Sequence, residues 1–330
     1  MKEKKKGRGL KVFLCILAVL AVFFTTVNLI PPKKVMENNP FLKEKDELPM
    51  IAAHRGGGVS NPENTLLAFR KAVSEYGIRI CETDVWMTSD GHLVYSHDAK
   101  INRMACPEGT PDIVIAEHTL AELRSYNMGY NFADPQSGEY IYRDASEEEQ
   151  EALGLKILEF DELLAEFYDT HKDLLFIVEI KNGGETGFRA AELMDKTLSE
   201  RFPDYKQNLV VGTFHPEIEK DLAENHPTLM RGASTAGAAK FVLTQMLGVN
   251  LFSGADFTCL QIPMSYTIKG VKLDLTWRTY IDRAHRRNIA VQFWTINDAD
   301  DMRFLIERGV DAIMTDDPQL LRSVLEEYKK

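Results

Sequence analysis

The chain has 330 residues, with 39 Lys and Arg against 50 Asp and Glu, and a net charge of −11. Residues 1–11 hold six of the basic residues and one acidic residue, which leaves a net of −16 on the rest of the chain. Such an acidic body argues against nucleic acid as a partner. The four cysteines show no Cys-x-x-Cys spacing, which argues against a zinc site.

The N-terminal region predicts a membrane anchor. Residues 12–30 form an apolar run that is long enough to span the hydrocarbon core of a bilayer. The basic residues 1–11 predict a cytoplasmic tail, a single-pass helix in the cell membrane and a domain outside it. A cleavable signal peptide is the alternative. We favour the retained anchor, since the run is long and no clear small-x-small cleavage site precedes the two prolines at 31–32. The polar residues 31–48 are expected to form a tether.

Residues 51–98 concentrate chemically active side chains near predicted strand ends. A short apolar run from Met50 ends in His54 and Arg55, and three glycines follow, a pattern typical of a buried strand that opens into a loop. Residues 61–77 predict a capped amphipathic helix that ends at Gly77.

The next predicted strand, residues 78–85, carries two carboxylates on one face, Glu82 and Asp84. Neighbouring carboxylates repel unless positive charge lies between them, and a hard divalent cation with oxygen ligands would supply it. A short strand at 93–96 then leads to His97. Two histidines beside a metal would act as general acid and base. Each feature alone is more often structural, but their coincidence at strand ends favours catalysis.

These motifs carry a family resemblance. The sequence reads HRG at 54–56, PENT at 62–65, Glu-x-Asp at 82–84, SDG at 89–91 and HD at 97–98. Together they resemble the glycerophosphodiester phosphodiesterase family, and the resemblance extends over nearly all of residues 50–319. It implies hydrolysis of glycerophosphodiesters to sn-glycerol 3-phosphate and an alcohol.

The remaining chain predicts an α/β fold of the (β/α)8 barrel type for residues 49–330, with a small insertion at about 99–157 after the second strand. An acidic run at 147–151 lies in this insertion and is read as a solvated face, with a lid as the alternative. Beyond residue 158, strands and helices alternate, giving eight strands in all, each except the last followed by a helix. The active site of such a barrel lies at the carboxyl ends of its strands. A doubly wound sheet is the alternative, but its nucleotide fingerprint after the first strand is missing.

Later strand ends supply further candidates. Glu179 and Lys181 lie on one face at the exit of the strand at 174–180, where a simple ion pair is the alternative explanation. The family resemblance implies that Glu179 is a third metal carboxylate and that Lys181 faces the substrate phosphate. It also implies that Trp294 walls the glycerol pocket, with core packing as the alternative. Phe214 and Gln261 are candidates for the same pocket because they end strands. The Thr-Asp-Asp-Pro sequence at 315–318 resembles the closing motif of the family and is read as mainly structural.

The residues suggest a mechanism. A divalent cation held by Glu82, Asp84 and Glu179 would act as Lewis acid and template. Arg55 would hold the phosphate with a forked pair of hydrogen bonds. His54 and His97 would share the acid and base roles in an order that the sequence leaves open. The attacker is either the neighbouring glycerol hydroxyl, through a cyclic phosphate, or water.

Metal and substrate remain open at this level. Three carboxylates leave magnesium, calcium or manganese, and calcium is favoured for a domain outside the cell. Free diesters, lysophospholipid headgroups and polyglycerolphosphate polymers are the candidate substrates, and no obligate protein partner is inferred. The alternatives are a related barrel phospholipase, of the phosphoinositide phospholipase C or sphingomyelinase D kind, and a non-catalytic anchored binding module.

Overall fold

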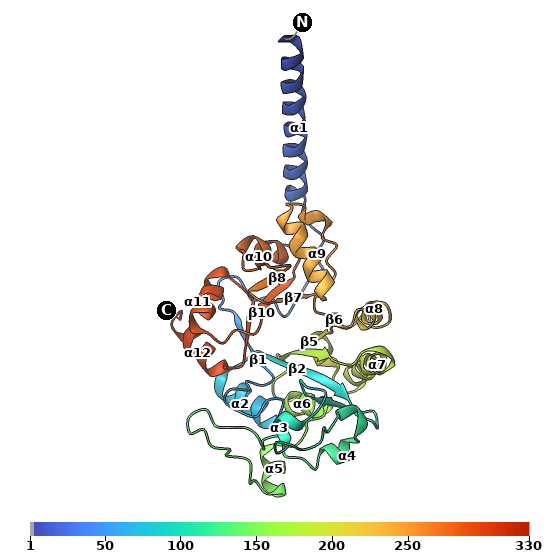
Figure 1. Cartoon of the computed structure of the whole chain (residues 1–330), viewed down its shortest axis with the longest axis vertical. Helices are drawn as coiled ribbons and strands as arrows, with labels where there is room; N and C mark the ends of the chain where they lie inside the picture. The colour runs from blue at the N-terminus through green and yellow to red at the C-terminus, as the bar shows by residue number, and fades with distance from the viewer. Residues whose placement is uncertain (1–2, 330) are drawn as a thin grey trace.

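A sheet of eight parallel strands forms the centre of the computed structural model, which describes residues 3–329 (Figure 1). The barrel strands are β1 (Met50–His54), β2 (Ile80–Met87), β4 (Leu175–Ile180), β5 (Leu209–Gly212), β6 (Met230–Arg231), β7 (Cys259–Ile262), β10 (Ala290–Phe293) and β11 (Ala312–Thr315). Each lies in a segment where the sequence predicts a strand, so the predicted barrel is confirmed and the doubly wound alternative is wrong.

The sheet closes on itself through a short seam. The strand order is β6-β5-β4-β2-β1-β11-β10-β7, and the two ends meet at a parallel bridge between Gly232 and Cys259. Two backbone hydrogen bonds support this bridge, from Thr258 N to Arg231 O and from Ala233 N to Cys259 O, both 2.8 Å. The seam, with one bridge, is therefore the shortest pairing of the barrel, in which the other neighbouring strands register over two to six residues.

Helices cover the outside of the barrel and bury their apolar faces against it. The helices that follow the barrel strands are α2 (Leu66–Tyr76), α6 (Phe160–Phe167), α7 (Gly184–Glu200), α8 (Pro216–Asn225), α9 (Thr235–Met246), α10 (Arg278–His285), α11 (Ala299–Arg308) and α12 (Pro318–Glu326). Helix α2 ends at Gly77, as the sequence predicts, and begins after the cap residue Thr65 rather than at residue 61. The expectation that no helix follows the last strand is wrong, because α12 begins at Pro318 and buries Leu321 and Val324.

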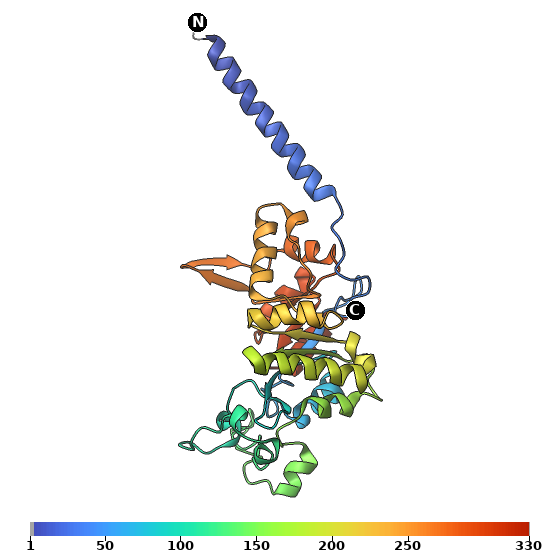
Figure 2. The ribbon, with the colours of Figure 1, turned by 90° about the vertical axis from the view of Figure 1, so that its right-hand side faces the viewer.

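Three additions decorate the barrel. The insertion after β2 contains β3 (Leu93–Tyr95), which pairs antiparallel with β2, then α3 (Asn102–Ala105), η1 (Ile115–Glu117), α4 (Leu120–Leu123) and α5 (Glu147–Leu153). It has a small apolar core of its own that includes Ile101, Leu123 and Ile157. The acidic run forms α5, which has no buried residue. Two short 3-10 helices are η2 (Pro203–Gln207) and η3 (Asn250–Phe252), and a hairpin of β8 (Ser265–Ile268) and β9 (Val271–Asp274) projects from the body (Figure 2).

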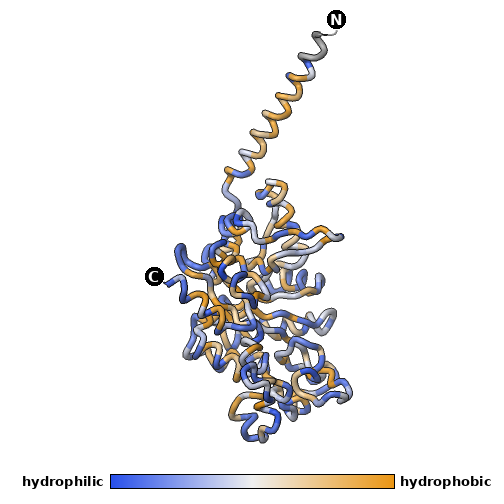
Figure 3. The backbone as a smooth tube through the Cα atoms, turned by 60° about the vertical axis from the view of Figure 1, so that its left-hand side comes forward, coloured by the Kyte–Doolittle hydropathy of each residue, from blue (hydrophilic) through white to orange (hydrophobic). Residues whose placement is uncertain are grey.

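A long helix, α1 (Glu3–Leu29), extends away from the barrel (Figure 1). Within the described residues it is the one helix long and apolar enough to cross a membrane, a property that a signal sequence near the N-terminus shares. Figure 3 shows a nearly unbroken apolar stretch along α1, whereas the body mixes apolar and polar residues.

Residues 31–48 do not form the free tether that their polarity suggests. Phe41 is fully buried and packs with Ile80, Leu175 and Ala312, residues that begin their strands. The Asn39 side chain donates hydrogen bonds to the carbonyls of Thr258 and Asn288 (both 2.8 Å). This segment therefore closes the end of the barrel opposite the carboxyl ends of the strands.

Candidate active site

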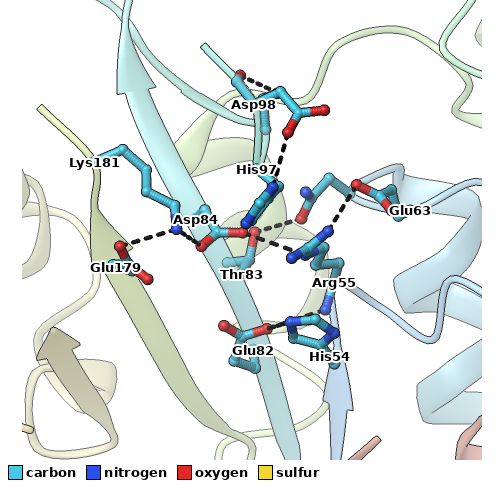
Figure 4. Close-up of polar contacts among 12 residues, drawn as sticks. His54, Arg55, Glu63, Glu82, Thr83, Asp84, His97, Asp98, Glu179 and Lys181 are labelled. Carbon is cyan, nitrogen blue, oxygen red and sulfur yellow. Dashed lines mark hydrogen bonds and ion pairs between the residues drawn. The ribbon is translucent and has the colours of Figure 1, made fainter. Parts of the chain in front are cut away.

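Three adjacent strands bring most of the predicted site residues together. In the order β4-β2-β1, residue His54 is registered with Glu82, and Asp84 with Glu179. Because the strands are parallel, these side chains meet at one end of the barrel. Figure 4 shows the two imidazoles and the Arg55 guanidinium around the carboxylates of Glu82 and Asp84.

His54 is held by an acidic residue from the last strand end. Its Nδ1 lies 2.5 Å from Asp316 Oδ1, and its Nε2 lies 3.9 Å from Glu82 Oε2. Burial lowers the pKa of His54, but the hydrogen bond with Asp316 and the charge of Glu82 outweigh it, so this pKa lies above its usual value of 6.5.

Asp316 is in turn fixed by Asn297. The Asn297 amide donates to Asp316 Oδ2 (2.7 Å), and its Oδ1 accepts from the backbone N–H of Asp316 (2.9 Å). The sequence reads residues 315–318 as mainly structural, whereas the structure brings Asp316 of this motif into contact with His54. A signal was present, because Asp316 and Asn297 follow two predicted barrel strands at the same end as His54.

Arg55 adopts a left-handed conformation that turns the loop back over the strand end, with φ of 53°. Its backbone N–H donates to the carbonyl of Glu82 (2.9 Å) and lies 3.1 Å from Glu82 Oε2. Its guanidinium lies between Glu63 (Nη1 to Oε1, 3.4 Å) and Asp84 (Nε to Oδ2, 3.6 Å). Gly57, two residues further along, also has positive φ, and a Cβ there would approach Pro318 to 2.7 Å, so the loop requires glycine.

The carboxylates of Glu82, Asp84 and Glu179 lie close together, and neighbouring cations partly neutralise their negative charge. Burial raises the pKa of Glu82 to about 7, opposed by the charge of His54 and reinforced by Asp84. Lys181 Nζ lies 2.8 Å from Asp84 Oδ1 and 2.9 Å from Glu179 Oε1, so the ion pair considered in the sequence is present and includes Asp84 as well. Burial also raises the pKa of Glu179, although Lys181 opposes this shift.

The carboxylate oxygens of these three residues suit a hard cation, although the ammonium of Lys181 lies between Asp84 and Glu179. Among residues 3–329, no group of three or more His, Cys, Asp or Glu side chains is close enough to hold a metal ion as the side chains lie. Asp84 Oδ2 is nevertheless buried and has no hydrogen-bond partner among the described residues. A buried carboxylate oxygen that accepts no hydrogen bond, beside two carboxylates of raised pKa, fits a divalent cation with oxygen ligands.

His97 belongs to a second polar chain at the rim. Its Nδ1 lies 2.9 Å from Asp98 Oδ1, Asp98 Oδ2 accepts from Arg103 Nε (2.7 Å), and Arg103 Nη2 donates to Glu63 Oε1 (2.5 Å). The sequence does not identify Arg103 or Glu63 as site residues, although Glu63 lies in the PENT motif. Asn64 of the same motif accepts a buried hydrogen bond from Thr83 (2.7 Å), which ties the loop to β2.

The proposed pocket residues occupy the same end of the barrel but are less constrained. The side chains of Phe214 and Trp294 follow β5 and β10 and are 64% and 36% exposed. Gln261, by contrast, donates to Gln292 Oε1 (3.1 Å) on the neighbouring strand β10 and so belongs to the barrel wall.

Known proteins resemble this chain over most of its length. The family described as the Glycerophosphoryl diester phosphodiesterase family matches residues 54–320. A glycerophosphodiester phosphodiesterase of Caldanaerobacter subterraneus is 27% identical over 272 residues, covering 82% of this chain and 96% of the relative. A glycerophosphodiester phosphodiesterase of Bacillus subtilis is 24% identical and covers 98% of this chain and 100% of the relative.

Solved structures share the fold. The glycerophosphoryl diester phosphodiesterase domain of a Mycobacterium tuberculosis protein has a TM-score of 0.65 at 18% identity, over 84% of this chain and 99% of that chain. A phosphodiesterase of Oleispira antarctica, solved in complex with the product sn-glycerol-3-phosphate, has a TM-score of 0.61 at 21% identity, over 84% of this chain and 97% of that chain.

Proposed function

The chain belongs to the glycerophosphoryl diester phosphodiesterase family, and on that premise we propose that it hydrolyses glycerophosphodiesters to sn-glycerol 3-phosphate and an alcohol. The observation that carries this proposal is the convergence of His54, His97 and Arg55 on the carboxylates at the ends of β2 and β4. A binding module without turnover would not need two imidazoles that are each oriented by a carboxylate.

The histidines are prepared for proton transfer at one defined atom. Each Nδ1 lies within hydrogen-bonding distance of a carboxylate, Asp316 for His54 and Asp98 for His97. Because a carboxylate accepts, each Nδ1 carries the hydrogen, which leaves both Nε2 atoms to exchange protons with substrate. One imidazole takes the proton of the attacking water or glycerol hydroxyl, and the other protonates the leaving alcohol.

Arg55 and Lys181 supply the positive charge that a phosphodiester requires. The guanidinium of Arg55 is 3.4 Å or more from its carboxylate partners, so it retains donors for a forked contact with phosphate oxygens. Lys181 is within 3 Å of both Asp84 and Glu179, where its ammonium can neutralise charge that develops on the phosphate.

We further propose that Glu82, Asp84 and Glu179 hold one divalent cation. When bound, such a cation supplies Lewis-acid polarisation of the phosphodiester. The raised pKa of Glu82 and the unpartnered Asp84 oxygen support this assignment, since bound positive charge would favour both ionised carboxylates. The ligands are all hard oxygens, which suit calcium or magnesium, and calcium is the favoured ion because the barrel is proposed to lie outside the cell.

The proposed location is the cell membrane, with α1 as a single-pass anchor and the barrel outside the cell. The support is the apolar run of α1 and the basic residues that precede it.

The test is release of glycerol 3-phosphate from glycerophosphocholine by the full chain in detergent micelles, after EDTA and after adding back calcium, magnesium or manganese. We expect EDTA to abolish turnover and calcium to restore it. Turnover that resists EDTA would contradict the metal assignment, and full recovery with magnesium but not calcium would contradict the choice of ion. A folded chain that releases no glycerol 3-phosphate under any metal would contradict the proposed reaction.

A further inference from the structure

One part of the surface departs from the acidic character of the molecule. Residues 232–273 contain one acidic residue, Asp256, and three lysines, whereas the whole chain has 50 acidic residues in 330. This segment includes α9, η3, β7, β8 and all but the last residue of β9.

The same segment exposes apolar side chains. Leu243, Met246 and Leu247 lie at spacings of three and four along the end of α9, and their side chains are 55%, 53% and 58% exposed. Phe252, at the end of η3, is 57% exposed. We call these four residues the α9 patch. Contiguous exposed apolar residues with few acidic neighbours are typical of a surface that has a partner.

The α9 patch lies beside the point where the end of α1 contacts the body. Asn28 of α1 donates to the carbonyl of Gly248 (2.9 Å), which lies between the end of α9 and η3, and accepts from Arg283 of α10 (3.0 Å). Arg286 donates to the carbonyl of Asn28 (3.1 Å), and Val27 is buried. These contacts hold the last turns of α1 to the barrel body.

The position of these contacts along α1 indicates how deep the α9 patch would lie in a bilayer that α1 spans. The apolar span of α1 extends to Leu29, and Phe24 is the α1 residue nearest to the position where a Gly248 Cβ would lie (3.6 Å). Five residues of α-helix rise about 7 Å along the axis. Parts of the body beside Phe24 therefore lie within the last 7 Å or so of the apolar span, which corresponds to the depth that interfacial helices reach.

The hairpin also indicates which side of the body faces the bilayer. It follows β7, so it rises from the end of the barrel that holds His54, and its apolar side chains Ile268 and Val271 are 48% and 62% exposed beside Lys269 and Lys272. Figure 2 shows that α1 leans over the side of the body from which the hairpin projects. A bilayer that α1 crosses would therefore approach the hairpin.

We propose that the α9 patch and the tip of the hairpin lie in the headgroup region of the bilayer that α1 spans, and that they turn the mouth of the barrel toward that bilayer. The lysines suit an anionic lipid surface. The inference rests on the proposed function and its anchor, and it narrows the substrate class to glycerophosphodiester groups at a membrane surface.

The first experiment measures membrane contact. The exposed Cys15 is first replaced by serine in the full chain, since the other three cysteines are buried. A single cysteine is then introduced at Leu247, Phe252 or Ile268 and labelled with bimane. The chains are placed in phosphatidylglycerol and phosphatidylcholine vesicles with brominated acyl chains. We expect loss of fluorescence at 247 and 252, a smaller loss at 268, and none at a matched control, Leu153→Cys, on the exposed helix α5.

A second control separates the possible failures. Val19→Cys reports α1 itself. Quenching at 19 without quenching at 247 and 252 would overturn the proposal and leave the anchor intact, and disulfide-linked dimers of Phe252→Cys in that case would identify a second copy as the occupant. No quenching at 19 would remove the anchor and the proposal together. Turnover of glycerophosphocholine by the same vesicles reports the phosphodiesterase activity independently and shows that each variant is folded.

The second experiment tests the substrate class. We compare a double variant, Leu247→Asp with Phe252→Asp, with the control variant Leu153→Asp. Turnover of each is measured on lysophospholipid in vesicles and on glycerophosphocholine in solution. Since the change removes two apolar groups from the interface, we expect the ratio of lipid to soluble turnover to fall about tenfold, with no change in the control. An unchanged ratio, or a wild-type chain that cleaves only the soluble diester, would overturn the membrane-surface substrate.

Discussion

The β1–β2–β4 side of the barrel and the β6–β7 seam use the same parallel pairing but differ in its extent. Strands β2 and β4 pair over six residues, from Ile80 to Val85, whereas β6 has two residues and meets β7 at a single bridge. The extended side carries Glu82, Asp84 and Glu179, which must be held in fixed relative positions. The seam carries none of the proposed catalytic groups, and the helix beyond it carries the α9 patch. Regular pairing is thus concentrated where chemistry requires it.

Removing an imidazole at the extended side should have the largest effect. We expect His54→Ala and His97→Ala each to lower kcat by roughly 10²–10⁴, since each removes a general acid or base. Turnover of glycerophosphocholine measures this loss. His118→Ala is the matched control, because within the described residues the His118 side chain hydrogen-bonds only with the carbonyl of Val114 in its own loop. A loss below tenfold at either His54 or His97 would contradict its catalytic role.

Truncating the residue that closes the opposite end of the barrel should act on stability. Phe41 is fully buried against the first layer of the barrel, so Phe41→Ala should lower the free energy of unfolding by about 3–5 kcal/mol. Denaturant unfolding measures this change. Leu10→Ala, on the exposed face of α1, serves as the control. If 31–48 were a free tether, both changes would be equally small.

Asp316→Asn should have an intermediate effect on turnover and an informative effect on pH dependence. We expect kcat to fall by about 10–100-fold, because the amide no longer fixes the protonated Nδ1 of His54. The hydrogen bond with Asp316 raises the pKa of His54, so its loss should lower that pKa. The limb of the pH–rate profile governed by His54 therefore moves to lower pH.

The limb that moves identifies the role of His54. A shift of the acid limb means that His54 must be deprotonated and acts as base, whereas a shift of the alkaline limb means that it acts as acid. A profile with both limbs unchanged would contradict the pairing of His54 with Asp316.

The smallest expected effect concerns the seam between β6 and β7. A Cβ at Gly232 would approach Gln261 Oε1 to 2.5 Å, so Gly232→Ala must displace that amide and should cost about 1 kcal/mol of unfolding free energy. Gly212→Ala, at the end of β5, meets nothing within 4 Å and should be neutral or slightly stabilising. Equal effects at the two positions would mean that the seam is no more sensitive than the rest of the barrel.

Sequence reasoning succeeded where the signal was local. The eight strands, the end of α2 at Gly77 and the positions of His54, Glu82 and Asp84 at strand ends follow from patterns within a few residues. It failed where the contact joins distant segments. Asp316 lies 262 residues from His54, and its place after a predicted strand indicates the shared end of the barrel but not the hydrogen bond between the two side chains. Phe41 is likewise a single aromatic residue within a polar stretch, and only the assembled barrel provides the side chains against which it packs.

The pairing of His54 with Asp316 has a consequence for biosynthesis. Strand β1 lies between β2 and β11, so one of its neighbours is made immediately and the other only near the end of synthesis. A chain emerging from the ribosome can form the carboxylate pair on β2 early, but His54 gains its orienting partner only when residue 316 has emerged. Nascent or prematurely terminated chains therefore lack an oriented His54, so the hydrolytic site is completed only when synthesis of the barrel is nearly finished.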